Sequence, residues 1–191
     1  MLETLLELDK ELFIFLNTLG SASWDPLWLL ITNKLTFVPF YAILLFLIYR
    51  NLDLKSFLLL ILVVAGLITF TDQITNLVKH VLVKRPRPCR VEDIQELMRF
   101  VAEHCGRHGF FSGHSSNSMA AAVFAGLLLR SQYKNLIFIL LFWSALVAYS
   151  RIYVGVHYPL DIICGMAFGA FAGFLFYKLQ LLLRKRFISK D

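Results

Sequence analysis

Long apolar runs separated by short polar segments make up most of this chain. Five of the runs are candidates for membrane-crossing helices, and they cover residues 24–49, 56–79, 115–129, 135–153 and 159–183. A helix that crosses the hydrocarbon core needs roughly 17 to 25 mostly apolar residues, and the last two runs reach that length only with polar residues that a bundle interior can hold. The pattern predicts an all-α integral membrane protein, a bundle of five to six helices.

The first 20 residues have a different pattern, in which leucines alternate with acidic residues. This is typical of an amphipathic helix that lies on the membrane surface. The segment lacks the basic start and the small-residue cleavage site of a secretory signal, so we expect it to be retained. We therefore expect a single membrane domain over residues 1–191, with a surface helix over 1–20 and a non-cytoplasmic active-site loop over 84–113.

Hydrophobic residues make up 58% of the 191 residues, and the formal net charge is +6. The chain has no polar basic domain, so we expect no nucleic-acid partner. The positive-inside rule instead assigns one set of helix ends to the cytoplasm. The basic residues there are Arg50, Lys55, Arg130, Lys134, Arg184, Lys185, Arg186 and Lys190. Residues 84–113 and 151–158 then share the opposite face of the membrane. The lysines and arginines of residues 84–113 contradict the positive-inside rule, and an anion-binding function would explain this exception.

Three groups of polar residues meet at that face, and ionisable residues at membrane depth usually mark a functional site. The first group is KHVLVKRPRP, Lys79 to Pro88. An arginine fork binds two phosphate oxygens at once, and the prolines stiffen the turn that presents Arg85 and Arg87. The simpler interpretation is a basic helix end near lipid headgroups.

The second group is FSGHSSNSMAAA, Phe111 to Ala122. Gly113 permits an unusual turn, and Ser115 or Ser116 can cap the following helix. A helix start binds anions readily, and His114 beside it titrates near neutral pH. Simple capping remains an alternative for this group.

The third group is SRIYVGVHYPLD, residues 150–161. Pro159 suits the first turn of a helix, so Asp161 lies one turn beyond His157. A carboxylate that accepts one imidazole N–H leaves the other ring nitrogen free to attack. A His–Asp pair that merely stabilises a helix corner would leave Arg151 unexplained.

In this order the three groups resemble the signature of the type 2 phosphatidic acid phosphatase (PAP2) superfamily. That signature is a Lys with Arg-Pro, then Ser-Gly-His, then Ser-Arg, five residues, His, three residues and Asp; residues 150–161 match the third motif throughout. The resemblance extends from the second apolar run to the fifth. It implies metal-independent hydrolysis of a lipid phosphate or pyrophosphate through a phosphohistidine, with no cofactor.

Two departures from the signature stand out. Phe111 replaces the usual proline of the second motif. In the first motif, six residues usually separate the Lys from Arg-Pro, which places His80 at the Lys position and Lys79 one residue early. One residue turns a helical side chain by about 100°. Three explanations are open: a local π-bulge turns Lys79 toward the site, His80 supplies the cation instead, or this cation is dispensable. We favour Lys79.

Residue by residue, the resemblance implies that His157 attacks phosphorus while Asp161 holds its ring, and that His114 protonates the departing lipid oxygen. It also implies a set of groups that bind the phosphate oxygens. These are Arg151, Arg87, Lys79, Ser112 and Gly113, with Arg85 as second choice to Arg87.

Of the three cysteines, Cys164 lies within a predicted helix, where we expect it to serve only in packing. Cys89 and Cys105 both lie on the loop, where a disulfide would tie the Arg-Pro turn to the His114 segment in an oxidising compartment. The alternative is a zinc site from Cys89, His104, Cys105 and His108, whose spacing matches no standard finger.

Other functions stay open. A non-catalytic protein that binds anionic lipid needs the cations but not the His–Asp pair, and Asp72 within the second run is the residue that favours a transporter. A phosphotransferase on the same scaffold is a further alternative. The expected substrates are undecaprenyl pyrophosphate, phosphatidylglycerol phosphate, phosphatidic acid and lipid A phosphate, in a bacterial inner membrane with the site facing the periplasm.

Overall fold

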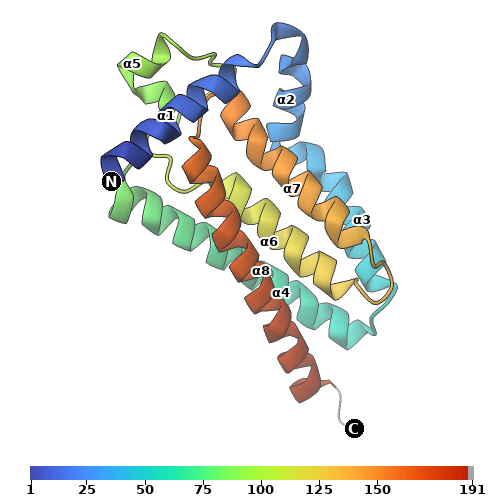
Figure 1. Cartoon of the computed structure of the whole chain (residues 1–191). Helices are drawn as coiled ribbons and strands as arrows, with labels where there is room; N and C mark the ends of the chain where they lie inside the picture. The colour runs from blue at the N-terminus through green and yellow to red at the C-terminus, as the bar shows by residue number, and fades with distance from the viewer. Residues whose placement is uncertain (189–191) are drawn as a thin grey trace.

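The computed structural model describes residues 1–188, which form a bundle of helices (Figure 1). The longer helices are α1 (Leu2–Thr18), α2 (Asp25–Thr32), α3 (Val38–Tyr49), α4 (Leu54–Leu77), α6 (Gly113–Leu128), α7 (Leu136–Tyr153) and α8 (Pro159–Phe187). The short elements are η1 (Ala22–Trp24), η2 (Lys34–Phe37), η3 (Val78–Val83), η4 (Pro88–Arg90) and α5 (Glu92–Gln95). No β-strand occurs in this range, so the expected all-α fold is confirmed.

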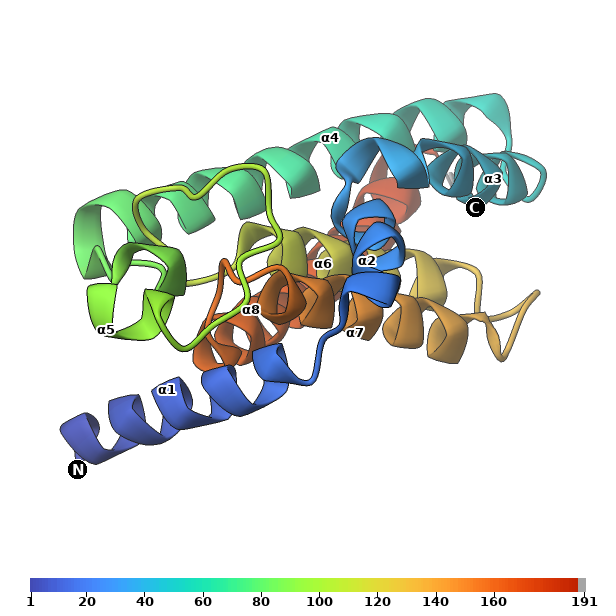
Figure 2. The same cartoon turned by 90° about the horizontal axis from the view of Figure 1, so that it is seen from above.

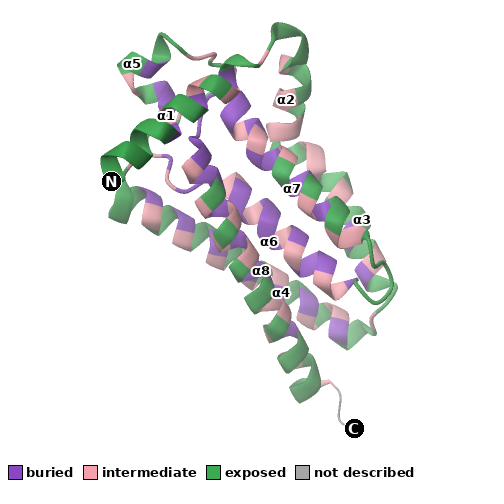
Figure 3. Ribbon diagram, viewed as in Figure 1, coloured by how far each residue is buried: buried purple, intermediate pink, exposed green. Residues whose placement is uncertain are grey.

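Helix α6 lies at the centre of the bundle and packs against α8, α7 and α4 (Figures 1 and 2). Most of its residues are buried, and Figure 3 shows this burial continuing onto the facing sides of α7 and α8. The outward sides carry large exposed apolar residues, among them Leu62, Phe138 and Phe171. Such a surface suits contact with lipid tails rather than water.

The close contact between α6 and α8 depends on three glycines of α8. Gly165, Gly169 and Gly173 recur every four residues, so they lie on one face of the helix. A methyl group added at Gly165 would lie 2.7 Å from the Ser112 carbonyl oxygen, and one added at Gly173 would lie 2.5 Å from that of Ala120. Small residues at this spacing let two helix backbones approach closely, as is common in membranes.

Three of the described helices are long and apolar enough to cross a membrane: Leu54–Val83, Leu136–Tyr153 and Pro159–Phe187. A bent pair, Ala22–Thr32 with Lys34–Tyr49, brings the number to four if it counts as one span. The chain is therefore a multi-pass membrane protein. The run at 115–129 forms α6, which is shorter and is enclosed by the other helices.

The run at 24–49 does not form one straight helix. Helices α2 and α3 meet at an angle of 61°. The Asn33 side chain caps η2 by accepting a hydrogen bond from the Leu35 amide at 2.9 Å, and Pro39 lies in the first turn of α3. Both features favour the start of a new helix. The bend places Thr32 and Lys34 at the turn between the two helices instead of in the middle of one straight span.

Helix α1 crosses the end of the bundle and turns polar residues inward. Asp9, Phe13 and Asn17 are its buried residues, at intervals of four. Asn17 donates hydrogen bonds to the carbonyl oxygens of Arg99, Ile152 and Tyr153 at 2.9–3.0 Å. The leucines of α1 are exposed on the other side, which is compatible with the predicted position at a membrane surface.

Candidate active site

The three polar groups of the sequence meet at one end of the bundle. Helix α4 ends there, α6 and α8 begin there, and α7 ends there, with residues 84–112 and α1 above them (Figure 1). The third group lies at the centre of this site, and the other two are arranged around it.

His157 and Asp161 form a buried pair at the start of α8. His157 Nδ1 lies 3.2 Å from Asp161 Oδ2, which also accepts a hydrogen bond from the Tyr158 amide at 3.2 Å. Their side chains are 2% and 0% exposed. Gly155, with φ of +83°, lets the chain turn so that the His157 amide reaches back to the Arg151 carbonyl oxygen. The imidazole thus turns Nδ1 to the carboxylate and keeps Nε2 for a substrate.

Burial lowers the pKa of His157 well below its usual 6.5, and the positive charges of Arg87, Arg151 and Lys79 lower it further. Both effects disfavour the charged form of an imidazole. His157 is therefore neutral at neutral pH, which is the form that can act as a nucleophile.

Asp161 is held from its other side by Arg85. Arg85 Nη1 lies 3.1 Å from Asp161 Oδ1, and Nη2 lies 2.7 Å from Asp9 Oδ2. Asp9 Oδ1 in turn accepts the Leu160 amide at 2.7 Å, and the Arg85 guanidinium stacks 3.9 Å from the Tyr158 ring centre. Arg85 is thus fully engaged with two carboxylates, so it orients the His–Asp pair and is not free to bind a phosphate.

The first motif contains a π-helical turn. Helix α4 continues into η3, a π-helix over Val78–Val83, and a π-helical turn holds more residues than an α-helical one. Lys79 is buried in this turn, whereas His80 is exposed, with its Nδ1 3.4 Å from His108 Nδ1. The charges that act most strongly on Lys79 are those of Arg87, Asp161 and Arg151. Of the alternatives given above, the π-bulge is the one present, and it turns Lys79 toward the site.

Arg87 follows in an extended segment beside the pair. Its Nε donates to the His108 carbonyl oxygen at 3.0 Å, and a methyl group added at Gly106 would lie 3.1 Å from its guanidinium carbon. No carboxylate within residues 1–188 forms an ion pair with Arg87. Its charge acts on His157 more strongly than that of any other cation. Arg87 therefore has the free guanidinium that Arg85 lacks.

The second motif starts α6. Ser112 is the cap, and its hydroxyl accepts a hydrogen bond from the Ser115 amide at 3.4 Å. The expectation that Ser115 or Ser116 caps this helix is therefore wrong, because Gly113 is already helical. The Ser112 amide donates to the Asp161 carbonyl oxygen at 3.0 Å, which ties the start of α6 to the start of α8.

His114 lies in the first turn of α6, half-buried. The charges that act on it are those of Arg151, Lys34, His157 and Lys79. The structure thus places both histidines and the same cations at one site. Lys34 reaches this group because of the bend between α2 and α3.

Arg151 completes the cationic group. Its Nη1 donates a hydrogen bond to Thr32 Oγ1, whereas its buried Nε has no hydrogen-bond partner among the described residues. An unpartnered buried donor costs about 1–3 kcal/mol, more for a charged group, so a site that keeps one is arranged for an acceptor from outside.

Sequence reasoning missed four residues of this site: Asp9, Thr32, Lys34 and Gly109. Asp9 had one usable signal, the four-residue spacing to Phe13 and Asn17. Thr32 and Lys34 were polar interruptions of an apolar run. At Gly109 an added methyl group would lie 2.8 Å from Asp161 Oδ2, so only glycine fits beside the pair.

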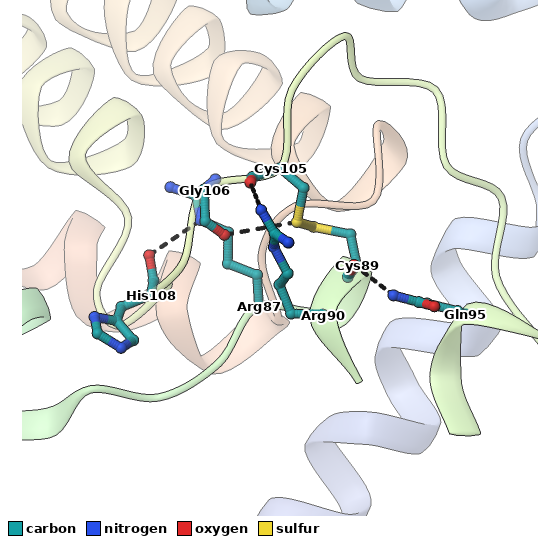
Figure 4. Close-up of a disulfide and its surroundings, with 7 residues drawn as sticks. All are labelled: Arg87, Cys89, Arg90, Gln95, Cys105, Gly106 and His108. Carbon is teal, nitrogen blue, oxygen red and sulfur yellow. Dashed lines mark hydrogen bonds between the residues drawn. A yellow bond between two sulfur atoms is a disulfide. The ribbon is translucent and has the colours of Figure 1, made fainter. Parts of the chain in front are cut away.

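A disulfide joins Cys89 and Cys105 (Figure 4), with their Cα atoms 6.2 Å apart. Arg90 Nη2 donates to the Cys105 carbonyl oxygen at 2.8 Å, and Gln95 Nε2 to that of Cys89 at 2.8 Å. Because the cysteines bond to each other, neither thiolate is available to zinc. No three His, Cys, Asp or Glu side chains in residues 1–188 are arranged to hold a metal.

Asp72 forms a contact between helices. Its Oδ1 accepts a hydrogen bond from Asn117 Nδ2 at 2.7 Å, which joins α4 to α6. This bond gives Asp72 a role in the packing of two helices, which does not require a transport function.

Known proteins match both the sequence and the fold. The model of the PAP2 superfamily matches residues 54–185. A lipid A 4'-phosphatase of Bacteroides thetaiotaomicron is 36% identical over 93% of this chain and 79% of its own length. A lipid A 4'-phosphatase of Porphyromonas gingivalis is 32% identical over 98% and 79%.

Two crystal structures share the fold. LpxE of Aquifex aeolicus has a TM-score of 0.62 at 23% identity, over 88% of this chain and 93% of that one. A PAP2-type phosphatidylglycerolphosphate phosphatase of Bacillus subtilis has a TM-score of 0.72 at 18% identity, over 98% and 90%. The chain belongs to the PAP2 superfamily, and it is a membrane lipid phosphatase of that family.

Proposed function

We propose that this PAP2 enzyme hydrolyses a phosphate monoester of a lipid A-type glycolipid through a phosphohistidine on His157. The observation that carries the proposal is the buried His157–Asp161 pair, whose free ring nitrogen lies among cations that form no ion pair with a carboxylate of residues 1–188. A nucleophile with its orienting carboxylate and a preorganised positive field are the two components that phosphoryl transfer needs.

In the first step His157 Nε2 attacks phosphorus and the bond to the lipid oxygen breaks. His114 enters this step protonated, because the negative charge of the bound phosphate offsets the burial and the neighbouring cations that otherwise favour its neutral form. It donates that proton to the lipid oxygen, so the lipid leaves as an alcohol. Arg87, Arg151 and Lys79 neutralise the charge on the equatorial oxygens, and the Gly113 amide at the start of α6 adds a hydrogen bond. Ser112 acts through its cap, which fixes that amide.

In the second step water attacks the phosphohistidine. His114, now neutral, accepts the proton of the water, the phosphorus–nitrogen bond breaks, and phosphate leaves with His157 restored. Asp161 holds the ring in one tautomer throughout. All positive charge at phosphorus comes from protein side chains, so we expect the reaction to proceed in EDTA.

Lipid A phosphate is favoured over the other expected substrates by the relatives. The two lipid A 4'-phosphatases match nearly the whole chain, whereas the undecaprenyl-diphosphatase BcrC of Bacillus subtilis is 27% identical over 63% of it. Undecaprenyl pyrophosphate is therefore the second candidate. Phosphatidylglycerol phosphate and phosphatidic acid complete the set that an assay must contain.

We further propose that the site faces the periplasm from the bacterial inner membrane. The basic residues Arg50, Lys55, Arg130, Lys134, Arg184, Lys185 and Arg186 lie near the helix ends opposite the site, and Lys190 lies outside the described residues. The positive-inside rule assigns that end to the cytoplasm. A disulfide at the site end agrees with an oxidising compartment.

The test is phosphate release in detergent with EDTA, from these four lipids, by wild type, His157→Ala and His104→Ala. His104 is an exposed histidine on the same loop, so its replacement controls for loss of an imidazole. We expect His157→Ala alone to abolish release, and lipid A phosphate to be the best substrate. Wild type that transfers its phosphoryl group to an acceptor without releasing phosphate would support the phosphotransferase alternative, and folded protein that turns over no lipid would support a binding role.

A second experiment tests the intermediate. Enzyme mixed briefly with lipid labelled on phosphorus and then denatured should carry acid-labile, alkali-stable label. The label should be absent from His157→Ala. In His114→Ala it should form more slowly and decay more slowly than in wild type, because both steps need His114. Label on another residue would refute the assignment of the nucleophile.

A further inference from the structure

A second group of basic residues lies on the back of the segment that carries Arg85 and Arg87. Residues 85–87 are extended and form a bridge with residues 107–109 through Pro86 and His108, and the Gly109 amide donates to the Arg85 carbonyl oxygen at 2.9 Å. Side chains of an extended chain alternate between its two sides. Arg85 and Arg87 accordingly point to the buried pair, whereas Pro86 is exposed on the other side. Lys84, which precedes the extended segment in a left-handed conformation, is exposed as well.

The residues on that other side line an open cavity of about 380 Å³ at the surface. It is lined by Lys84, Pro86, Arg90, Arg107 and His108. His80 approaches its edge through His108. We refer to this cavity and its lining as the outer basic pocket.

The outer basic pocket has a surplus of positive charge. Within the described residues Lys84, Arg90 and Arg107 form no ion pair with any carboxylate. Burial lowers the pKa of His108, and the charges of Arg107, His80 and Lys84 lower it further, as expected where like charges are close together.

The walls of this pocket are held in place. The Cys89–Cys105 disulfide connects its two strands of chain, and the Arg90 guanidinium donates to the Cys105 carbonyl oxygen across the same connection (Figure 4). Lys84 has φ of +51°, which turns the chain from η3 into the extended segment. Of the three cations only Arg90 is itself held by a hydrogen bond, but the chain that carries all three is held in place, which lowers the conformational entropy lost when an anion binds.

We propose that the outer basic pocket binds a second phosphate group of the lipid substrate, while the first is cleaved at His157. The inference rests on the proposed function. It narrows the substrate to a lipid whose headgroup carries two phosphates separated by sugar rings. The two groups of cations lie on opposite sides of one extended chain, so the anions they bind are on the order of 10 Å apart.

That separation distinguishes between the candidate lipids. In a diphosphate the two phosphorus atoms share one oxygen, so both must lie on the His157 side of the chain. A disaccharide with a phosphate at each end is long enough to reach both sides. The outer basic pocket therefore selects a bisphosphorylated glycolipid over undecaprenyl pyrophosphate and over a lipid with one phosphate.

The test compares two lipids and two charge-matched variants. The lipids are disaccharide lipid A with phosphates on both rings and the same lipid with only the phosphate that is cleaved, each in neutral detergent micelles. The variant is Lys84→Asn/Arg107→Gln, in which asparagine tolerates the positive φ of position 84. The control is Lys55→Gln/Lys134→Asn, which removes two exposed charges at the other end of the bundle.

We expect the Lys84/Arg107 variant to raise KM for the bisphosphorylated lipid roughly tenfold or more, since charge-assisted hydrogen bonds to one phosphate are lost, and to leave kcat unchanged. KM for the monophosphorylated lipid should change less than about twofold, and the control should change neither. An equal rise for both lipids would mean general attraction to anionic surfaces and would overturn the proposal, as would no rise at all.

A further arm identifies the source of the phosphate. KM for the monophosphorylated lipid is measured for wild type and the Lys84/Arg107 variant, with and without added phosphatidylglycerol or inorganic phosphate. If the two proteins differ only when one of these anions is added, the pocket binds that anion and the proposal is wrong. Equilibrium binding of both lipids to His157→Ala, with and without the Lys84/Arg107 changes, gives the same comparison without turnover. That arm separates a failure of the second site from a failure of the proposed hydrolysis.

Discussion

Replacing Asp9 by asparagine should slow catalysis although Asp9 lies on a different helix from every residue that contacts the phosphate. The change keeps the shape of the side chain and its oxygen acceptor for the Leu160 amide at 2.7 Å, but it removes the charge and replaces the oxygen that faces Arg85 by an NH2 donor. Arg85, at 2.7 Å from Asp9 and 3.1 Å from Asp161, then has one carboxylate partner instead of two. Its guanidinium is expected to shift toward Asp161 and to compete with His157 for that carboxylate.

The size of the effect follows from burial. The side chains of Arg85 and Asp9 are 15% and 5% exposed, so solvent screens their interaction little. Removing one partner of a buried ion pair typically costs 3–5 kcal/mol, and because Asp161 remains as a second partner we expect a loss of about 2 kcal/mol in stability. A weakened Asp161–His157 bond should lower kcat about tenfold and leave KM unchanged, because no group that binds the substrate is altered.

The assay is steady-state phosphate release in detergent, with Tm of the same preparations. Glu11→Gln, an exposed acid on the same helix, is the matched control and should behave as wild type. Arg85→Lys, which keeps the charge but not the fork, should reproduce the fall in kcat. A kcat for Asp9→Asn within twofold of wild type, at a lowered Tm, would show that Asp9 supports only the fold and would refute its role in positioning the pair.

Three further changes test other parts of the site and fold. Arg87→Gln removes the charge that, after burial, contributes most to the low pKa of His157. The acid limb of the kcat/KM profile, which we expect well below pH 6.5 in wild type, should therefore move to higher pH. An acid limb that does not move would mean that another group titrates there. Gly169→Leu, against the Ser116 backbone, should lower stability by 3 kcal/mol or more, on the order of the largest overpacking effects, and Gly169→Ala by less, as measured by Tm. Deleting Val81 from the π-helical turn should restore an α-helix and retain activity within about tenfold, and an inactive, folded deletion would show that the turn itself is required.

The sequence predicted those parts of the site whose residues are close together along the chain. His157 and Asp161 are four residues apart across a helix start, and Ser112 to His114 lie within one turn, so chain geometry alone brings each set together. The family signature then supplied their order. The number of apolar runs predicted the bundle, because lipid requires every spanning segment to satisfy its own backbone hydrogen bonds.

What the sequence did not predict depends on contacts between distant segments. Asp9 is paired with Arg85 and is packed against the start of α8, and no spacing rule connects residues so far apart. Thr32 meets Arg151 only because the first span bends at Asn33. The glycines of α8 were visible as a four-residue repeat, but the helix they face could be identified only from the packing.

The two neighbouring arginines show why a motif position does not by itself assign a role. Arg85 and Arg87 have the same side chain, each precedes a proline, and each points to the same side of an extended segment. The difference between them comes from Asp9 of α1 and Asp161 of α8, which both pair with Arg85 and form no ion pair with Arg87. Because a guanidinium held between two carboxylates has its charge already neutralised, only Arg87 retains attraction for a phosphate. In the proposed mechanism α1, which contributes no group to the reaction, thus helps to determine which arginine binds the substrate and which one holds the nucleophile in place.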